Sequence, residues 1–187
     1  MQLQTLIAGF GGQGILLMGQ LLAEAAMDEG FHATWFPSYG PEMRGGTANC
    51  ATIIADEEIG APISRQYDAV IVMNEPSQDR FASIVRPGGL LLANDDLIPV
   101  RCARTDIESC YVPASRLARE AGNERTANVV ILGALLALRP SVSPAALERA
   151  IQKRLGAKKP EALEANFKAL RLGAEHVHAA GAPVGCR

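Results

Sequence analysis

Four glycines that follow a short apolar run are the feature that most narrows the folds open to this chain. The stretch AGFGGQGI, residues 8–15, carries glycines with the spacing G-x-G-x-x-G. Residues 3–8 before it have the pattern of a buried strand, and residues 15–29 after it repeat apolar side chains at helical spacing. Because glycine permits a tight turn between a strand and a helix, we predict the opening of a βαβ unit. This feature favours an α/β fold.

The rest of the chain continues the alternation of strand and helix patterns as far as about residue 125. We predict further strands at residues 31–36, 47–55, 68–73, 90–93 and from 111, and helices at 76–85 and from about 115. Only helix patterns follow, at 128–138, from 144 and from 160. We therefore predict one domain, 1–187, with an α/β core over about 1–125 and a helical C-terminal part over about 126–180. The fold class is a three-layer, mostly parallel, Rossmann-like sheet with helices on both faces.

The composition argues against several classes of partner. The chain has 18 lysines and arginines against 20 acidic residues, so its net charge of -2 gives no reason to expect binding to nucleic acid or to an anionic membrane. The longest apolar run, 129–138, is short of the about 20 residues that a membrane span needs. A helix that is apolar on all sides but this short is expected in a protein core.

Cysteine and histidine spacing predicts no metal or iron–sulfur site. The cysteines are Cys50, Cys102, Cys110 and Cys186. None belongs to a C-x-x-C pair, and His176 and His178 are two residues apart, so they point to different faces of a helix. We assign no catalytic residue, because a cysteine such as Cys50 among strand residues is typical of an inert small side chain. The printed sequence starts without a signal-peptide pattern, so we expect free thiols and a cytoplasmic chain.

The glycine loop is a candidate anion site, because the amides that open a helix carry the positive end of its dipole. The candidate cofactor-binding residues are Gly9, Gly11, Gly12, Gln13, Gly14 and, after the fourth strand, Asn74. A nicotinamide site also needs an acidic residue at the end of the second strand, but that strand ends with Trp35–Phe36–Pro37. Two structural alternatives stay open: close packing of strand on helix as the reason for the glycines, and a turn as the reason for Asn74.

A second unusual loop, SYGPEMRGGTANC, occupies residues 38–50 and contains several residues that break regular structure. Its polar and aromatic candidates are Ser38, Tyr39, Glu42 and Arg44. They either form a solvated turn with a surface ion pair or present Arg44 to a carboxylate, a phosphate or a partner chain. Since ligands of open α/β sheets bind beyond the carboxyl ends of the strands, we expect both loops at that edge.

Four motifs in order, GFGGQGI, SYGPEMRGGTANC, MNEPSQDRF and RPGGLL, closely resemble the gamma subunit of 2-oxoacid:ferredoxin oxidoreductases. The resemblance runs from the N-terminus to about residue 140. Within the family, the sequence looks most like the 2-oxoglutarate or 2-oxoisovalerate type. It implies oxidative decarboxylation of a 2-oxoacid with coenzyme A (CoA), giving an acyl-CoA, carbon dioxide and reduced ferredoxin.

The resemblance also implies which cofactors and partners to expect. The complex uses thiamine diphosphate, Mg²⁺, iron–sulfur clusters and CoA. The thiamine chemistry belongs mainly to the alpha and beta subunits, and the iron–sulfur clusters lie on beta or delta. This chain is expected to hold none of them tightly and to be inactive alone, although a homodimer of the isolated chain stays open. The glycine loop would face CoA phosphates, and Ser38, Tyr39, Glu42 and Arg44 would contact partners or line a channel. The alternative is a self-sufficient NAD(P)- or FAD-binding oxidoreductase or regulatory domain.

Overall fold

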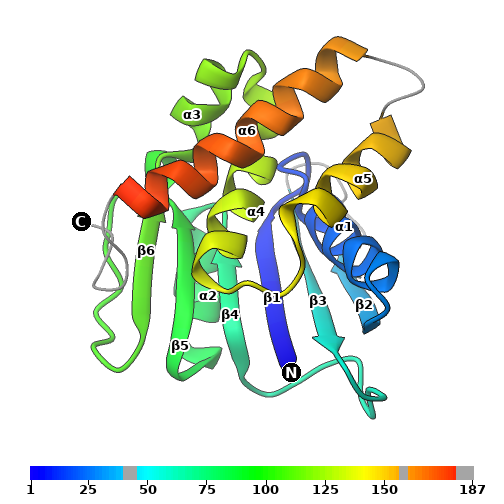
Figure 1. The fold of residues 1–187 in the computed structure, drawn as a ribbon. Helices are drawn as coiled ribbons and strands as arrows, with labels where there is room; N and C mark the ends of the chain where they lie inside the picture. Colours follow the sequence, from blue (N-terminus) through cyan, green and yellow to red (C-terminus); the bar gives the residue numbers. More distant parts are fainter. Residues whose placement is uncertain (40–45, 156–159, 180–187) are drawn as a thin grey trace.

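A six-stranded sheet runs through the middle of the molecule (Figure 1). The structure is a computed structural model that describes residues 1–39, 46–155 and 160–179. The strands are β1 (Gln2–Phe10), β2 (His32–Tyr39), β3 (Thr47–Ala55), β4 (Tyr67–Val72), β5 (Val85–Asn94) and β6 (Glu108–Val112). Their order across the sheet is β2-β3-β1-β4-β5-β6. Each predicted strand is therefore present, and the α/β class is confirmed.

The sheet is mixed, so the predicted, mostly parallel architecture is confirmed only in part. Strands β1, β4, β5 and β6 pair in parallel, whereas β3 pairs antiparallel with both of its neighbours. The reason is the connection between β2 and β3, which spans only residues 40–46. A parallel crossover needs about a dozen residues or more, so a short connection makes a hairpin. The strand after the first helix thus lies at the sheet edge and not beside β1, and the Rossmann-like label is not confirmed.

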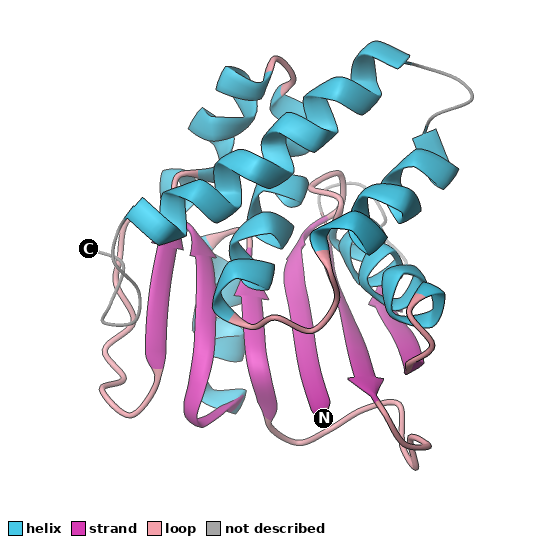
Figure 2. Cartoon of the chain, viewed as in Figure 1, coloured by secondary structure: helices cyan, strands magenta, loops and turns pink. Residues whose placement is uncertain are grey.

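The helices cover the two faces of the sheet unequally (Figure 2). They are α1 (Ile15–Asp28), α2 (Glu75–Phe81), α3 (Ala114–Ala121), α4 (Ala127–Leu138), α5 (Pro144–Leu155) and α6 (Pro160–Ala179). The larger core lies between one face and helices α1, α4, α5 and α6, with Ile7 and Leu92 among its fully buried side chains. Helix α2 covers the other face, over a smaller core that includes Val70 and Leu91. Most of the apolar burial is therefore on the helical C-terminal side.

Helix α4 is central to the larger core because it is apolar on every side, as its sequence predicts. It packs backbone against backbone with α6. A Cβ atom added to Gly133 would lie 2.0 Å from the carbonyl oxygen of Leu170, and one added to Gly173 would lie 1.9 Å from that of Val130. The two glycines let the helix axes approach closely, which fixes where α4 begins relative to the sheet.

Two simpler predictions can be compared with the structure. Cys50 and Cys102 are free thiols as expected, but Cys110 is disulfide-bonded, so the prediction of four free thiols is wrong there. In the part of the chain that the structure describes, no helix combines the length and the apolar character that crossing a membrane needs.

Candidate functional site

The two unusual loops meet at the edge of the sheet where β1 ends. The amide of Gly11 donates to the carbonyl oxygen of Gly46 at 3.0 Å, and Phe10 pairs with Thr47 at the start of β3. The end of β2 and the start of β3 therefore lie at the same edge as the glycine loop. Tyr39 pairs through its backbone with Ala48 at that edge. The expected neighbourhood of the two loops is therefore present.

The candidate residues of the second loop are only partly described. Ser38 is exposed near the end of β2, where it pairs with Asn49. Glu42 and Arg44 lie outside the described residues, and the side chain of Tyr39 is likewise not described. Their role at a partner or channel surface stays a prediction.

Gln13 ties the glycine loop to the end of the next strand. Its side-chain oxygen Oε1 accepts hydrogen bonds from the amide of Phe10 at 2.7 Å and from Nδ2 of Asn74 at 3.0 Å. Its Nε2 donates to the carbonyl oxygen of Met73 at 3.1 Å. One side chain thus holds the ends of β1 and β4 together, and one N–H of its amide remains for a ligand.

Asn74 connects this arrangement to a helix. Its Oδ1 accepts from the amide of Ser77 at 3.0 Å, which makes Asn74 the N-cap of α2. Side-chain acceptors at this position satisfy amides that the helix itself leaves unpaired. Asn74 and Gln13 are therefore joined by a direct hydrogen bond, and both sit where strands of the parallel part of the sheet end.

The glycines of the loop are required for different structural reasons. Gly12 and Gly14 have φ angles of 97° and 76°, the left-handed region that disfavours side chains. Gly9 is buried in β1, where a Cβ atom would lie 2.5 Å from Ile15 and 2.6 Å from Gln13. Close packing of strand on helix thus accounts for Gly9, whereas Gly12 is exposed and has open space beside it.

A cavity of about 250 Å³ opens beside Gly12. It lies beyond the carboxyl ends of the parallel strands, where α/β sheets bind their ligands. Its lining is Gly12, Gln13, Met73, Asn94, Leu97, Ser115, Glu124, Arg125, Ala127 and Asn128. Of the six predicted cofactor-binding residues, Gly12 and Gln13 line this cavity. Gly9, Gly11, Gly14 and Asn74 are not among the residues that line it.

The sequence analysis did not find five polar residues that line the cavity: Asn94, Ser115, Glu124, Arg125 and Asn128. Asn94 ends the apolar run of β5 just as Asn74 follows β4, and this repeated pattern could have indicated it. Its Oδ1 accepts from the amide of Ala114, and its Nδ2 donates to the hydroxyl of Ser115, both at 3.2 Å. Asn128 lies in the first turn of α4 and Arg125 in the short turn 124–126 just before it, and no local pattern connects either residue with the glycine loop.

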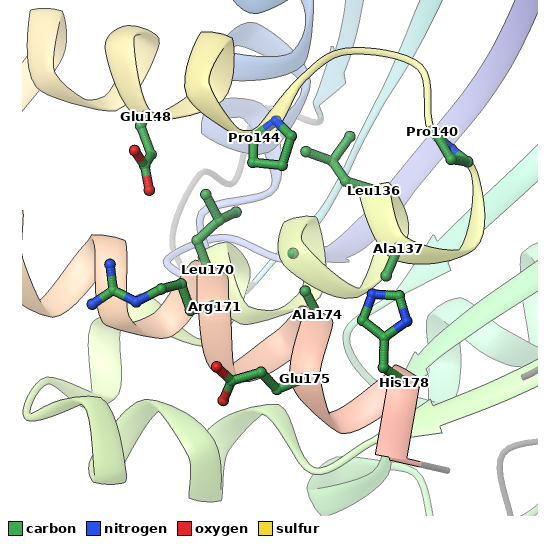
Figure 3. A pocket seen from close by; sticks show the side chains of 11 residues that line it. Leu136, Ala137, Pro140, Pro144, Glu148, Leu170, Arg171, Ala174, Glu175 and His178 are labelled. Carbon is green, nitrogen blue, oxygen red and sulfur yellow. The ribbon is translucent and has the colours of Figure 1, made fainter. Parts of the chain in front are cut away.

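A larger hollow of about 400 Å³ lies elsewhere, among α4, α5 and α6 (Figure 3). Its floor is apolar and includes Leu136, Pro144 and Leu170, while Glu148, Arg171, Glu175 and His178 are its ionisable residues. No three His, Cys, Asp or Glu side chains cluster as metal ligands among the described residues. The smaller, more polar cavity is therefore the better candidate for binding a ligand.

Cys50 lies close to the site but has the properties of a core residue. Its thiol donates to the carbonyl oxygen of Ile15 at 3.4 Å, at the start of α1. Burial raises the pKa of the Cys50 thiol from 9.0 to about 12. A nucleophilic cysteine needs the thiolate form near neutral pH, so this environment makes Cys50 unreactive.

Fold and site together define an α/β protein with a polar cavity at the carboxyl edge of its parallel strands and a glycine loop beside it. The chain belongs to the pyruvate ferredoxin/flavodoxin oxidoreductase family, whose model matches residues 4–176. The resemblance stated from the four sequence motifs is thereby confirmed.

Similar proteins describe the family membership more closely. The ketoisovalerate oxidoreductase subunit VorA of Methanothermobacter thermautotrophicus is 39% identical over 93% of this chain, which covers 36% of that protein. The 2-oxoglutarate synthase subunit KorC of Methanothermobacter marburgensis is 34% identical, with 94% of this chain and 96% of that protein covered. The crystal structure of a keto/oxoacid ferredoxin oxidoreductase gamma subunit from Geobacter sulfurreducens has a TM-score of 0.82 and 33% identity, covering 95% of this chain and 99% of that one.

The relatives differ in length. This chain spans about a third of the two VorA proteins but nearly the whole of the KorC protein from Methanothermobacter marburgensis. The same kind of domain therefore occurs both as a separate subunit and as part of a longer chain.

Proposed function

We propose that this chain is the gamma-type subunit of a 2-oxoacid:ferredoxin oxidoreductase. The complex would convert a 2-oxoacid and CoA into an acyl-CoA and carbon dioxide, with two electrons passed to ferredoxin. The observation that carries the proposal is the similarity to the Geobacter sulfurreducens gamma subunit over nearly the full length of both chains.

We assign this chain a supporting role in the complex and not that of a cofactor carrier. The described residues include no cluster of metal-ligating side chains, and both free cysteines stand alone. We assign thiamine diphosphate, Mg²⁺ and the iron–sulfur clusters to alpha, beta or delta subunits, where they supply the decarboxylation and electron-transfer chemistry. This chain would shape the assembly and the entry of CoA, with Ser38, Tyr39, Glu42 and Arg44 near partner subunits.

The glycine-loop cavity is the proposed place for CoA. Gly12 is exposed at its wall, and the side chain of Gln13 retains one N–H for an acceptor. The N-terminus of α1 directs its positive end toward the same loop, which suits a phosphate. Gly9, Gly11, Gly14 and Asn74 would then act by holding the loop in place.

The proposed substrate is 2-oxoglutarate, because KorC proteins match this chain over most of their own length. A second candidate, 2-oxoisovalerate, is favoured by the higher identity of 39–43% to the VorA proteins. The self-sufficient NAD(P) or FAD alternative finds less support, because β2 ends at Tyr39 with no acidic residue to hold a ribose.

Co-expression with the alpha- and beta-type subunits tests the proposal. We expect this chain to copurify with them and the complex to reduce ferredoxin with 2-oxoglutarate and CoA, while the chain alone shows no turnover. Parallel assays with 2-oxoisovalerate and pyruvate decide the substrate. Tight binding of NADH or FAD by the isolated chain, without any association with the other subunits, would contradict the proposal.

A further inference from the structure

The walls of the hollow among α4, α5 and α6 are held in place by separate contacts (Figure 3). Helix α5 is bound to α1 by the ion pairs Arg149–Asp28 at 2.9 Å and Arg154–Glu24 at 2.6 Å. Helix α6 lies against α4, backbone to backbone, at Gly173. None of the residues that line the hollow also lines the cavity beside the glycine loop, so the two are separate places in the fold.

The floor of the hollow is apolar. Leu136 and Leu170 are 6% and 3% exposed, and Pro144 and Ala174 extend the same surface. The volume of about 400 Å³ falls within the roughly 300–1,000 Å³ that is typical of small-molecule pockets. An apolar group placed on this floor is removed from water together with the side chains beneath it. The floor therefore favours a ligand with a compact apolar group.

Two opposite charges lie at the rim of this floor and do not pair with each other. The carboxylate of Glu148 points from α5 toward α6, and Arg171 extends from α6 on the same side of the hollow (Figure 3). Neither side chain makes a hydrogen bond or an ion pair with any residue that the structure describes. Glu175 also lines the hollow, but its carboxylate points away from Glu148. A carboxylate and a guanidinium that both await a partner suit a ligand that carries both charges.

We infer that the hollow binds a free α-amino acid with an apolar side chain. The carboxylate of the ligand bonds to the guanidinium of Arg171, its ammonium group bonds to the carboxylate of Glu148, and its side chain covers the apolar floor. Arginine can hold a carboxylate through two parallel N–H donors, and hydrogen bonds between charged groups are the stronger kind. The inference goes beyond the proposed function and does not depend on it.

Calorimetric titration of the full chain with leucine tests the site, together with two analogues that each lack one charge. The analogue 4-methylpentanoate has no amine, and isoamylamine has no carboxylate. We expect leucine to bind at least about tenfold more tightly than either analogue, because each analogue leaves one charged rim residue without a partner. Glycine, which has both charges but no apolar side chain, should bind more weakly than leucine.

Variants of the two rim residues assign each charge of the ligand to one side chain. Arg171→Gln should weaken leucine binding at least about tenfold but should not weaken binding of isoamylamine, which has no carboxylate to lose a partner. Glu148→Gln should weaken leucine binding by a similar factor but should not weaken binding of 4-methylpentanoate. Arg119→Gln and Glu164→Gln remove exposed charges of α3 and α6 that do not line the hollow, and both should bind leucine as wild type does.

A further variant fills the hollow. Ala174→Leu places a larger side chain on the floor and should abolish leucine binding with little change in Tm. The inference is wrong if millimolar leucine gives no saturable signal with wild type, or if leucine binds no more tightly than both analogues. It is also wrong if leucine binds the chain alone but not its complex with other subunits, because the hollow is then an interface with a partner.

Discussion

Gln13 is the residue on which the shape of the candidate site most depends. It makes three side-chain hydrogen bonds, to Phe10, Met73 and Asn74, and thereby connects the ends of β1 and β4. Phe10 ends β1, whereas Met73 and Asn74 directly follow β4. An amide is needed at this position because it both accepts and donates, which no carboxylate at neutral pH and no aliphatic side chain can do.

We expect Gln13→Ala to lower the free energy of unfolding by about 2–4 kcal/mol, because the amide of Phe10 loses its acceptor. Gln13→Glu gives a sharper result. Its carboxylate still accepts, but at neutral pH it faces the carbonyl oxygen of Met73, so folding raises the pKa of the new carboxyl. The free energy of unfolding of Gln13→Glu, relative to that of wild type, should therefore be highest below about pH 4 and should fall as pH rises. Urea unfolding at pH 4 and pH 7 measures this, and a pH-independent difference would contradict it.

Cys50 permits a second prediction at the scale of one residue. Its thiol has a folded-state pKa of about 12 against 9.0 unfolded, because it is desolvated by burial. Below pH 9 the thiol is protonated in both states, and above pH 9 only the unfolded state ionises. The folded state should then lose about 1 kcal/mol per pH unit between pH 9 and 12. Cys50→Ala should lack this loss in urea unfolding at pH 8 and pH 10.

Alkylation provides an independent check on Cys50. In the folded chain at pH 8, iodoacetamide should leave Cys50 unmodified and label the partly exposed Cys102 faster. In urea both thiols should react at similar rates. Rapid labelling of Cys50 in the folded chain would contradict the burial of its thiol.

At the scale of elements, the contact between α4 and α6 decides how the helical half sits on the sheet. Gly173→Ala should lower the free energy of unfolding by about 3 kcal/mol or more, because the added Cβ would lie 1.9 Å from the carbonyl oxygen of Val130. Helix propensity alone predicts that the free energy of unfolding rises by about 1 kcal/mol. The sign of the measured change therefore decides between steric overlap and helix propensity. Gly60→Ala, where nothing lies within 4 Å, is the matched control and should change stability by less than about 1 kcal/mol.

The helices and strands also show which parts of the fold could be predicted from the sequence. The strand, glycine loop and helix at the N-terminus were predictable because the apolar periodicity and the turn are local properties. The reversed direction of β3 was missed because a strand's own residues do not encode its direction, although the short 40–46 connection did. Gly12 and Gln13 were found at the cavity from one motif, whereas Asn128 reaches it only because α4 packs under α6 and over the sheet, a property of tertiary structure.

At the scale of the whole molecule, the two ends of β1 have separate roles. The chain starts at the edge of the sheet opposite the cavity, since β1 runs nine residues from Gln2 to the glycine loop. That length corresponds to about 30 Å. The α-amino group of Met1 is exposed and pairs with the exposed Asp56. Such surface pairs contribute little to stability. The N-terminus is therefore a place where additional chain can be attached without touching the candidate site.

In some relatives a domain of this kind forms about a third of a longer chain. We expect a fusion of a partner subunit to the N-terminus of this chain through a flexible linker to assemble and turn over like the separate chains. The fusion removes the charge partner of Asp56, so the pKa of that carboxyl, now lowered by its hydrogen bond to the terminal amine, should return toward 3.8. NMR titration of Asp56 and ferredoxin reduction by the purified fusion measure the two expectations. As a control, the same linker is inserted between Gly11 and Gly12. This insertion should abolish turnover, because it separates β1 from the cavity wall. If the insertion variant is as active as the N-terminal fusion, the glycine-loop edge has no part in the function.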